Sequence, residues 1–330
     1  MRPDPAIEQF VRRSGLISAS AEAAWQPLSG GVSSDIWLVQ SAETTFCVKR
    51  ALPRLRVAAE WLAPVERNAT EVDWLRAVSQ FMPEAVPAVL AADSAIGVFA
   101  MPYFPPDSYE PWKSRLQIGI VSEDTASEVG RRLARLHSTF AQSDEAPITF
   151  ATDERFHALR IEPYLLATAR AHPDLAPVLE SLADETLTTR FTVVHGDVSP
   201  KNILLGPSGP VFIDAECAWF GDPSFDVAFC LNHLILKSFW IPSSRDALLM
   251  AFGALWSAYR EGVDWESPDA TEKRAARLLP ALLLARIDGK SPVDYLDDRA
   301  RLKVRAFARG LLTDRLERLN DLQDACASTK

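Results

Sequence analysis

Apolar and polar residues alternate in short runs through the first hundred positions of the chain. The alternation predicts three strands, over residues 33–39, 45–48 and 96–101. The second of these runs carries Lys49 at its end. Before the third run, apolar residues recur at the spacing of one helix face and predict a helix over residues 64–78. The first hundred residues therefore predict a small sheet accompanied by one helix.

The pattern becomes helical after the proline-rich stretch at residues 101–106. Residues 125–140 place apolar side chains on one face, and Thr125 with Glu128 predicts a capping box at the start of this helix. Further elements are expected as a strand at 191–194, a hairpin at 203–213 and helices from residue 222 onward. The change of pattern predicts an α+β chain with an N-terminal lobe over 1–101, a hinge over 102–106 and a helical lobe over 107–330.

Length, composition and charge narrow the class of protein. The chain has 330 residues, of which 48% are apolar and 24% charged, values typical of a globular protein with room for two lobes. With 35 Lys and Arg against 44 Asp and Glu, its net charge of −9 argues against a general nucleic-acid binder. The four scattered cysteines, the absence of an apolar leader and the short apolar runs predict a cytoplasmic protein with no membrane partner. We expect a monomer or a homodimer.

The residues that carry chemistry lie in one segment. Residues 195–202 have the sequence HGDVSPKN, and a second predicted strand delivers Asp214 twelve residues after Asn202. Phosphoryl transfer from ATP needs an aspartate that orients the attacking hydroxyl, together with amide and carboxylate oxygens that hold Mg²⁺. Asp197 is then the base, and Asn202 and Asp214 are the metal ligands. An isolated aspartate in a turn is more often a helix cap or a turn-forming residue; the full spacing favours catalysis.

This segment resembles the aminoglycoside phosphotransferase and choline kinase family, whose fold is similar to that of protein kinases. The family carries HGD followed by four residues and Asn, and then D-x-E or D-x-D, as in Asp214 to Glu216. Residues 28–34, 133–137 and 221–228 also look like family motifs in the same order. The resemblance implies a bilobal protein-kinase-like fold, with a small lobe of antiparallel sheet plus helix and a large helical lobe, and with ATP and Mg²⁺ as cofactors.

The resemblance also implies a nucleotide site. Lys49 matches the lysine that contacts the nucleotide phosphates, and it should pair with a glutamate on the following helix. Glu71 fits that position best, with Glu66 as the rival. The remaining nucleotide contacts are expected from a phosphate-covering turn and from the hinge backbone: Gly30, Gly31, Ser33, Met101 and Tyr103. Val48 and Phe99 fit as walls of the adenine site, and equally as core residues.

Several residues near the segment keep two interpretations. Glu216 supports a second Mg²⁺ or its waters, or it is a surface carboxylate. His195, Asp222 and Asp226 are expected to brace the catalytic loop rather than to react, because a buried carboxylate needs its oxygens satisfied. His137 on the 125–140 helix is expected to be a structural histidine.

The acceptor is harder to predict. Residues 48–53 together with Arg56 resemble a stretch of methylthioribose kinases, which favours a sugar-like hydroxyl acceptor. The alternative for Arg54 and Arg56 is a solvated loop. Arg286 or Asp288 is a candidate for the acceptor pocket, and the alternative is an ordinary helix end. Residues 101–298 carry 18 Lys and Arg against 29 Asp and Glu. This negative net charge favours a neutral or cationic acceptor, although the positive charge of Arg286 argues against that inference.

The pattern as a whole predicts an ATP-dependent kinase that phosphorylates a hydroxyl of a sugar, an aminoglycoside or an amino-alcohol-like metabolite. A protein kinase is the first alternative, but the chain has Gly196 where protein kinases have Arg, and no A-P-E-like segment follows Asp214. A non-catalytic nucleotide-binding regulator on a kinase-like fold is the second alternative. The complete set of Lys49, Asp197, Asn202 and Asp214 argues against it.

Overall fold

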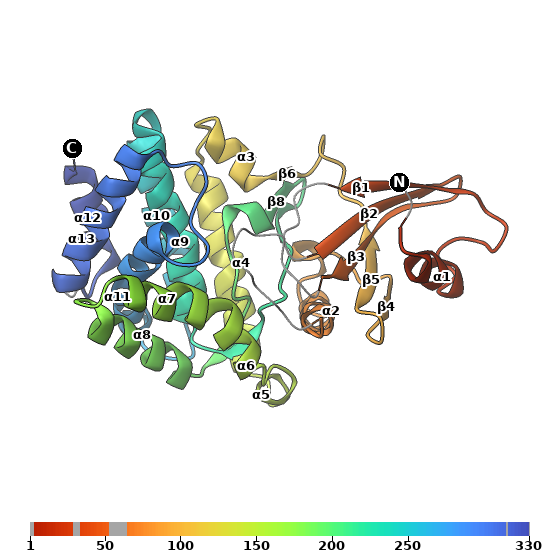
Figure 1. The fold of residues 1–330 in the computed structure, drawn as a ribbon, viewed down its shortest axis with the longest axis horizontal. Helices are drawn as coiled ribbons and strands as arrows, with labels where there is room; N and C mark the ends of the chain where they lie inside the picture. The colour runs from red at the N-terminus through yellow and green to blue at the C-terminus, as the bar shows by residue number, and fades with distance from the viewer. Residues whose placement is uncertain (1–2, 29–33, 53–64, 315, 330) are drawn as a thin grey trace. The chain divides into compact units, whose positions relative to one another are not determined.

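The computed structural model describes residues 3–28, 34–52, 65–314 and 316–329 (Figure 1). The chain forms two compact units. The N-terminal unit comprises Met1–Tyr109 and the short segment Val211–Glu216, and the helical unit comprises Glu110–Pro210 and Cys217–Lys330. The segment with Asp214 and Glu216 therefore belongs to the first unit, although it lies far along the chain.

A five-stranded antiparallel sheet forms the frame of the N-terminal unit. Its strands, in spatial order, are β1 (Ala23–Leu28), β2 (Ser34–Ser41), β3 (Thr45–Ala51), β5 (Val98–Pro102) and β4 (Ala91–Asp93). The three strands predicted from the sequence are confirmed as β2, β3 and β5. Strand β3 runs on to Ala51, so Lys49 lies inside the strand and not at its end. It sits opposite Ile36 on one side and Phe99 on the other, in the central strand of the sheet.

Alternation along β3 sends successive side chains to opposite faces of the sheet. Phe46 and Val48 join a core cluster with Ile7 and Phe10 of α1 (Pro5–Arg13). Val48 is thus a core residue, as the more cautious interpretation expected. Lys49 points to the other face, where α2 (Arg67–Ser79) contacts β3 and β5. The predicted helix over residues 64–78 is confirmed as α2 within the described residues.

The second unit is mainly helical. Its longer helices are α4 (Glu123–Ala141), α8 (Ala176–Thr188), α9 (Pro223–Trp240), α10 (Arg245–Arg260), α11 (Pro268–Asp288), α12 (Asp298–Asp314) and α13 (Leu319–Ser328). Shorter elements are β6 (Glu110–Pro111), α3 (Trp112–Gln117), α5 (Ala146–Thr149), α6 (Asp153–Phe156), a π-helix (His157–Leu166), α7 (Ala167–Ala171), β7 (Thr192–Val194), β8 (Ile203–Gly206) and β10 (Trp219–Gly221). Strand β9 (Gly209–Phe212) follows β8 as the predicted hairpin, and the unit boundary falls within it.

Helix α9 lies at the centre of this unit. It packs against α10 and α11, and α10 packs in turn against α4 (Figure 1). Every residue of α9 except the last is buried, which explains why its apolar residues are not confined to one face. None of the helices in the described part of the chain combines the length and apolarity that a membrane span requires. All four cysteines are buried free thiols.

The start of α4 differs from the prediction. Ser122 is the N-cap, and its hydroxyl accepts a hydrogen bond from the backbone N–H of Thr125 at 3.2 Å. The predicted capping box of Thr125 and Glu128 is therefore wrong. Glu128 instead pairs with Arg131 at 2.6 Å and with Arg132 at 3.0 Å. The sequence contained two possible caps, and the helix begins at the earlier one because its first turn also places Glu123 and Asp124 near the positive end of the helix dipole.

Candidate active site

Lys49 is held between two carboxylates in the N-terminal unit. Its ammonium donates to both carboxylate oxygens of Glu71, at 2.8 and 2.7 Å, and to Asp214 at 2.5 Å. Lys49 and Glu71 are only 3% and 2% exposed. The predicted pair of Lys49 and Glu71 is confirmed, whereas the rival Glu66 is exposed at the N-cap of α2.

Burial and charge act in opposite directions on this cluster. Burial by itself lowers the pKa of Lys49, but the negative charges of Asp214, Glu71 and Glu216 outweigh it and raise the pKa. Burial raises the pKa of Glu71 to about 7, although the ammonium of Lys49 opposes that shift. Lys49 therefore stays a cation at neutral pH and can bind an anionic group.

Asp214 has an unusual backbone. Its φ of 69° is the one positive value among the non-glycine residues of the described ranges. Residues other than glycine rarely adopt this left-handed conformation, and such outliers are concentrated at functional sites. The conformation directs the Asp214 carboxylate to Lys49 immediately after β9.

Glu216 is buried and forms an ion pair with Arg67, at 2.9 Å. The interpretation of Glu216 as a surface carboxylate is therefore wrong. Arg67 is fully buried and also donates to the carbonyl oxygen of Leu52 at 2.7 Å. The sequence reasoning missed Arg67. The sequence contained a signal for it, because a basic residue at the first position of α2 is unfavourable next to the positive end of the helix dipole. Such a residue is expected to have an acidic partner elsewhere in the fold.

Asp197 is surrounded by donors within the helical unit. The Asn202 side-chain amide donates to the Asp197 carboxylate at 2.8 Å and to its backbone carbonyl at 3.0 Å. Arg160 and Lys201 each approach the same carboxylate at 3.1 Å. Asp197 is 5% exposed, so these two cations and the Asn202 amide compensate for the water that the buried carboxylate has lost.

Arg160 and Lys201 were not anticipated. Lys201 lies four residues after Asp197, and a 3₁₀ turn at Pro200–Asn202 brings its side chain back to the carboxylate. Arg160 comes from the π-helix, which contains Pro163. Its guanidinium also donates to the carbonyl oxygens of Gly196 and Leu159. No local pattern links it to the catalytic loop, because the contact spans 36 residues.

Asp226 of α9 braces the catalytic loop as predicted. Its carboxylate accepts from the backbone N–H groups of His195 and Gly196, at 2.7 and 2.8 Å. His195 in turn accepts from the Asp197 N–H through Nδ1, at 3.2 Å. His137 lies between Asp226, at 3.2 Å, and the Tyr259 hydroxyl, at 2.8 Å, and is therefore the structural histidine that was expected.

Asp222 acts elsewhere. It caps α9 by accepting from the Ser224 N–H at 2.9 Å, and it pairs with Arg274 at 2.9 Å. These contacts fix the helix that carries Asp226, so any effect of Asp222 on the catalytic loop is indirect.

Gly196 has a structural reason for replacing the arginine of protein kinases. Its φ is 75°, and a Cβ at this position would lie 2.6 Å from the carbonyl oxygen of Cys217. A side chain at residue 196 is therefore excluded by both conformation and space.

Other predicted residues are placed as follows. Asp288 pairs with Arg305 and with His172, which ties the end of α11 to α12 and α7. Met101 pairs with Cys47 inside the sheet, and Tyr103 follows directly after β5. The glycine-rich turn with Gly30, Gly31 and Ser33, and the arginines Arg54 and Arg56, lie outside the described residues.

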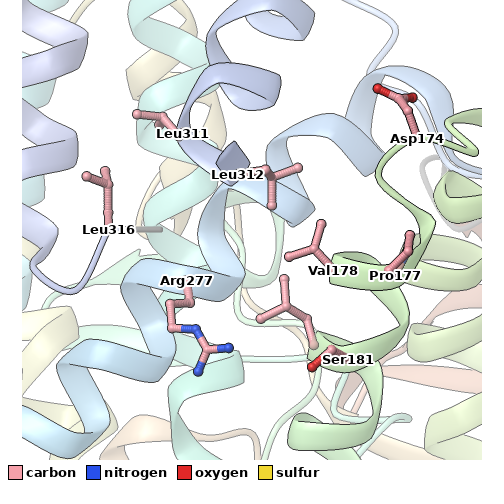
Figure 2. Close-up of a pocket in the computed structure, with 9 residues that line it drawn as sticks. Asp174, Pro177, Val178, Ser181, Arg277, Leu311, Leu312 and Leu316 are labelled. Atoms are coloured by element: carbon pink, nitrogen blue, oxygen red, sulfur yellow. The ribbon is translucent and has the colours of Figure 1, made fainter. Parts of the chain in front are cut away.

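A cavity of about 370 Å³ lies in the helical unit between α8, α11 and α12 (Figure 2). Its walls are formed by Pro177, Val178, Leu311 and Leu312, with Arg277 at the edge. It contains none of the predicted site residues and is distinct from the loop that carries Asp197.

Each unit contains an oxygen donor of a type that Mg²⁺ accepts. The Asn202 side chain in the helical unit donates to Asp197 through its amide nitrogen, so its oxygen is not used in that contact, and Asp214 in the N-terminal unit has a carboxylate. Oxygen ligands of these types are those that Mg²⁺ prefers. Within the described ranges, no three His, Cys, Asp or Glu side chains gather as a preformed metal centre. Nucleotide phosphates normally supply further ligands to Mg²⁺ in kinases.

Comparison with known proteins agrees with this chemistry. The family model of the phosphotransferase enzyme family matches residues 24–267. A methylthioribose kinase of Bacillus cereus is 25% identical over 287 residues, which cover 77% of this chain and 71% of that protein.

Solved structures share the fold. An amicoumacin kinase gives a TM-score of 0.59 at 12% identity and covers 91% of each chain. A choline/ethanolamine kinase family protein from Mesorhizobium loti gives 0.53 at 15% identity, covering 97% of this chain and 98% of that one. The α+β protein-kinase-like fold expected from the sequence is thus confirmed. The chain belongs to the phosphotransferase enzyme family, and it is an ATP-dependent kinase that phosphorylates an alcohol group.

Proposed function

We propose that the protein transfers the γ-phosphoryl group of Mg·ATP to a hydroxyl of a small metabolite of the sugar or amino-alcohol type, with Asp197 as the catalytic base. The observation that carries the proposal is the environment of Asp197: a nearly buried carboxylate held by Asn202, Arg160 and Lys201 in one loop. The names of the similar proteins, among them methylthioribose kinase and choline/ethanolamine kinase, support an acceptor of this type.

Asp197 orients the acceptor hydroxyl and takes its proton. The hydroxyl oxygen forms a bond to the γ-phosphorus, the bond from that phosphorus to the β–γ bridging oxygen breaks, and ADP leaves. Asp197 later releases the proton to water. Most of the catalysis in such a reaction comes from positioning and charge stabilisation rather than from the strength of the base.

The N-terminal unit binds the nucleotide in this proposal. Lys49 contacts the α- and β-phosphates and is aligned by Glu71. Gly30, Gly31 and Ser33 cover the phosphates, while the backbone groups of Met101 and Tyr103 contact the adenine ring.

Asn202 and Asp214 are the proposed ligands of Mg²⁺, which when bound neutralises charge on the phosphates. Glu216 has a second role in this proposal. Because it pairs with Arg67 at 2.9 Å, it acts by holding α2 next to the Asp214 segment, or through water on the metal.

Replacement of Asp197 by Asn tests the proposal. The amide cannot accept the proton, so we expect kcat to fall about 1,000-fold, within the range lost when a central catalytic group is removed. ADP release is measured with a panel of sugars, amino alcohols and aminoglycosides, and ATP affinity is measured by calorimetry. ATP affinity should stay within threefold of the wild type.

Asp246→Asn is the matched control, because Asp246 is an exposed aspartate of the same unit. Its kinetics should equal those of the wild type. Full turnover by Asp197→Asn would remove the proposed mechanism. Phosphate incorporation into protein rather than small molecules would revive the protein-kinase alternative, and ATP binding without any turnover would favour the regulatory one.

A further inference from the structure

Lys237 is a buried lysine for which the catalytic scheme has no use. It lies on α9, one turn after His233, and is 1% exposed. Its ammonium lies 4.6 Å from the ring centre of Tyr295 and 5.9 Å from that of Trp240. Among the described residues, no carboxylate forms an ion pair with it and no group accepts a hydrogen bond from it.

Two aromatic faces do not compensate for this burial. A desolvated cation over an aromatic ring is stabilised by about 2 kcal/mol. Removing an ammonium from water costs several kcal/mol, even after relaxation of the surroundings. The desolvation cost exceeds the stabilisation by the aromatic rings. This difference indicates that the ammonium of Lys237 binds an anionic partner that the chain itself does not supply.

Other cations act on the same place. After burial itself, Lys113 of α3 and Arg286 of α11 are the groups that lower the pKa of Lys237, and Asp294 is the one group that opposes them. Burial and then the charges of Arg286, Lys237, Lys201 and Lys113 hold the pKa of His233 well below its ordinary value. Positive charge therefore converges here from four separate elements of the helical unit.

Two further donors are unused. Within the described part of the chain, the Tyr295 hydroxyl and the Nε of Arg286 are buried and have no hydrogen-bond partner. Arg286 is held in place through one terminal nitrogen, which donates to the Tyr164 hydroxyl at 3.3 Å and to the Ser291 hydroxyl at 2.9 Å. Buried donors without acceptors are rare in folded proteins, and they mark a position where a ligand can accept.

This group of donors adjoins the catalytic base within the same unit. The His233 ring packs edge-on against Phe229, with ring centres 5.6 Å apart. The guanidinium of Arg160 lies 5.7 Å from the Phe229 ring centre, and Arg160 pairs with Asp197. Tyr164, one turn along the π-helix from Arg160, holds Arg286. Contacts through Phe229 and Tyr164 therefore connect these donors to Arg160, the partner of Asp197.

We propose that Lys237, Arg286 and the Tyr295 hydroxyl bind an anionic oxygen group of the acceptor, so that the substrate is an alcohol that also carries a carboxylate or a phosphate. The inference rests on the proposed function and deepens it. It differs from the sequence analysis, in which the net charge of residues 101–298 favoured a neutral or cationic acceptor. The local charge around a site outweighs the net charge of the unit that contains it. A cationic amino alcohol would meet repulsion from these side chains.

The test compares acceptors that differ only in charge. ADP release is measured with ribitol, ribonate, ribitol 5-phosphate and 1-amino-1-deoxyribitol, and with the matching three-carbon series from glycerol. We expect the carboxylate or the phosphate member to give a kcat/KM at least tenfold above that of the neutral alcohol, and the amine to be the poorest. The two anionic members distinguish carboxylate from phosphate recognition. Preference for the neutral or the cationic member would overturn the inference while leaving the kinase proposal intact.

Substitution of Lys237 separates binding from catalysis. Lys237→Met should raise KM for the anionic acceptor at least tenfold and leave KM for ATP unchanged, and Lys237→Arg should recover part of the loss. Lys273→Met is the control, because Lys273 lies on α11 as an exposed partner of Glu317 and should change neither constant. An unchanged acceptor KM in Lys237→Met would overturn the inference.

A binding measurement covers the case in which no member of the panel is phosphorylated. Sodium phosphate and ribonate should raise the Tm of the wild-type protein above that in sodium chloride of equal ionic strength, and Lys237→Met should abolish the increase. Equal shifts in both proteins would overturn the inference. Failure of ATP to bind the wild type would instead remove the proposed function.

Discussion

The ammonium of Lys49 is a buried positive charge on the central strand of the sheet. It is buried between Glu71 and Asp214, which compensate for the loss of water. A buried ion pair is often no more stabilising than apolar residues of the same size. The arrangement is therefore better explained by a positive charge held at a fixed point on the central strand than by stability.

Lys49→Met should damage stability and activity to different extents. It leaves Glu71 without its cation in a site that is only 2% exposed. Breaking one side of a buried pair costs about 3 kcal/mol, and loss of the phosphate contact should lower kcat/KM for ATP by at least about 100-fold. Denaturant unfolding and steady-state kinetics measure the two effects.

The double variant Lys49→Met/Glu71→Gln is the discriminating comparison. It removes the unpaired carboxylate, so stability should recover in part while activity stays low. Recovery of activity together with stability would show that Lys49 acts only on the fold.

Gly196→Ala should destabilise the protein because of its backbone. The left-handed conformation costs an alanine about 1–2 kcal/mol, and the new Cβ would also meet the Cys217 carbonyl at 2.6 Å. We expect a Tm at least several degrees lower by calorimetry. Gly310→Ala is the control, since an added Cβ there meets nothing within 4 Å of it and Gly310 lies inside α12. Alanine is the better helix former, so that variant should keep or raise the Tm.

Single elements were predictable where the signal was local. The alternation around β3 and the helical spacing in α2 placed Lys49 on a strand and Glu71 on a helix, because both patterns repeat within a few residues. Their pairing was expected from the resemblance to the kinase family, and the roles of Asp197 and Asn202 stay predictions from the HGD segment. Arg160 was not predictable. Its helix widens into a π-helix around Pro163, and its partner lies in a loop that is remote in sequence.

Helix α9 fixes the catalytic loop through one carboxylate. In Asp226→Asn, a single amide oxygen replaces the two oxygens that accept from His195 and Gly196, so one backbone N–H loses its acceptor. We expect kcat to fall about 10- to 100-fold with KM for ATP unchanged, as for a loss of positioning.

Asp222→Asn is the matched control on the same helix. Asparagine still caps a helix, but the ion pair with Arg274 is lost. The Tm should therefore fall while kcat is retained. A kcat loss in Asp222→Asn equal to that of Asp226→Asn would show that α9 as a whole, rather than the loop contact, sets the rate.

The charge of the whole molecule hides strong local contrasts. Residues 101–298 are acidic overall, with 18 Lys and Arg against 29 Asp and Glu, yet four cations converge near His233. Net charge can be read from a sequence, but this convergence depends on α3, α9, α11 and the catalytic loop meeting in space. For this reason the sequence alone favoured a neutral or cationic acceptor, whereas the proposed site favours an anionic one.

The stability of the molecule should depend on pH through Lys237. Burial, then Lys113 and Arg286, lower its pKa from 10.5 to about 8. Between these values the unfolded chain binds more protons than the folded one, so this group makes stability rise with pH from about 8 to 10.5. Below pH 8 the folded protein carries the full cost of the charge, about 3 kcal/mol at about 1.4 kcal/mol per pKa unit.

Lys237→Met should therefore be more stable than the wild type at pH 7 without ligand, and the difference should shrink toward pH 10.5. Denaturant unfolding of both proteins at pH 7, 8, 9 and 10 measures it, and taking the difference cancels the other titrating groups. A difference that does not change with pH would contradict the lowered pKa of Lys237.

The ion pair between Lys49 and Asp214 joins residues 165 positions apart, inside a unit whose residues outside the segment Val211–Glu216 all precede position 110. During synthesis residues 1–109 are made first, and residues 110–210 of the helical unit must follow before the segment with Asp214 is made. Contacts this distant in sequence form late, because the chain loses the entropy of closing a long loop before the contact can stabilise it. Lys49 therefore gains its second carboxylate late in folding, and a ribosome-bound chain that ends before residue 214 lacks this ion pair. Truncation cannot separate the two units, since residues 1–109 alone lack Asp214.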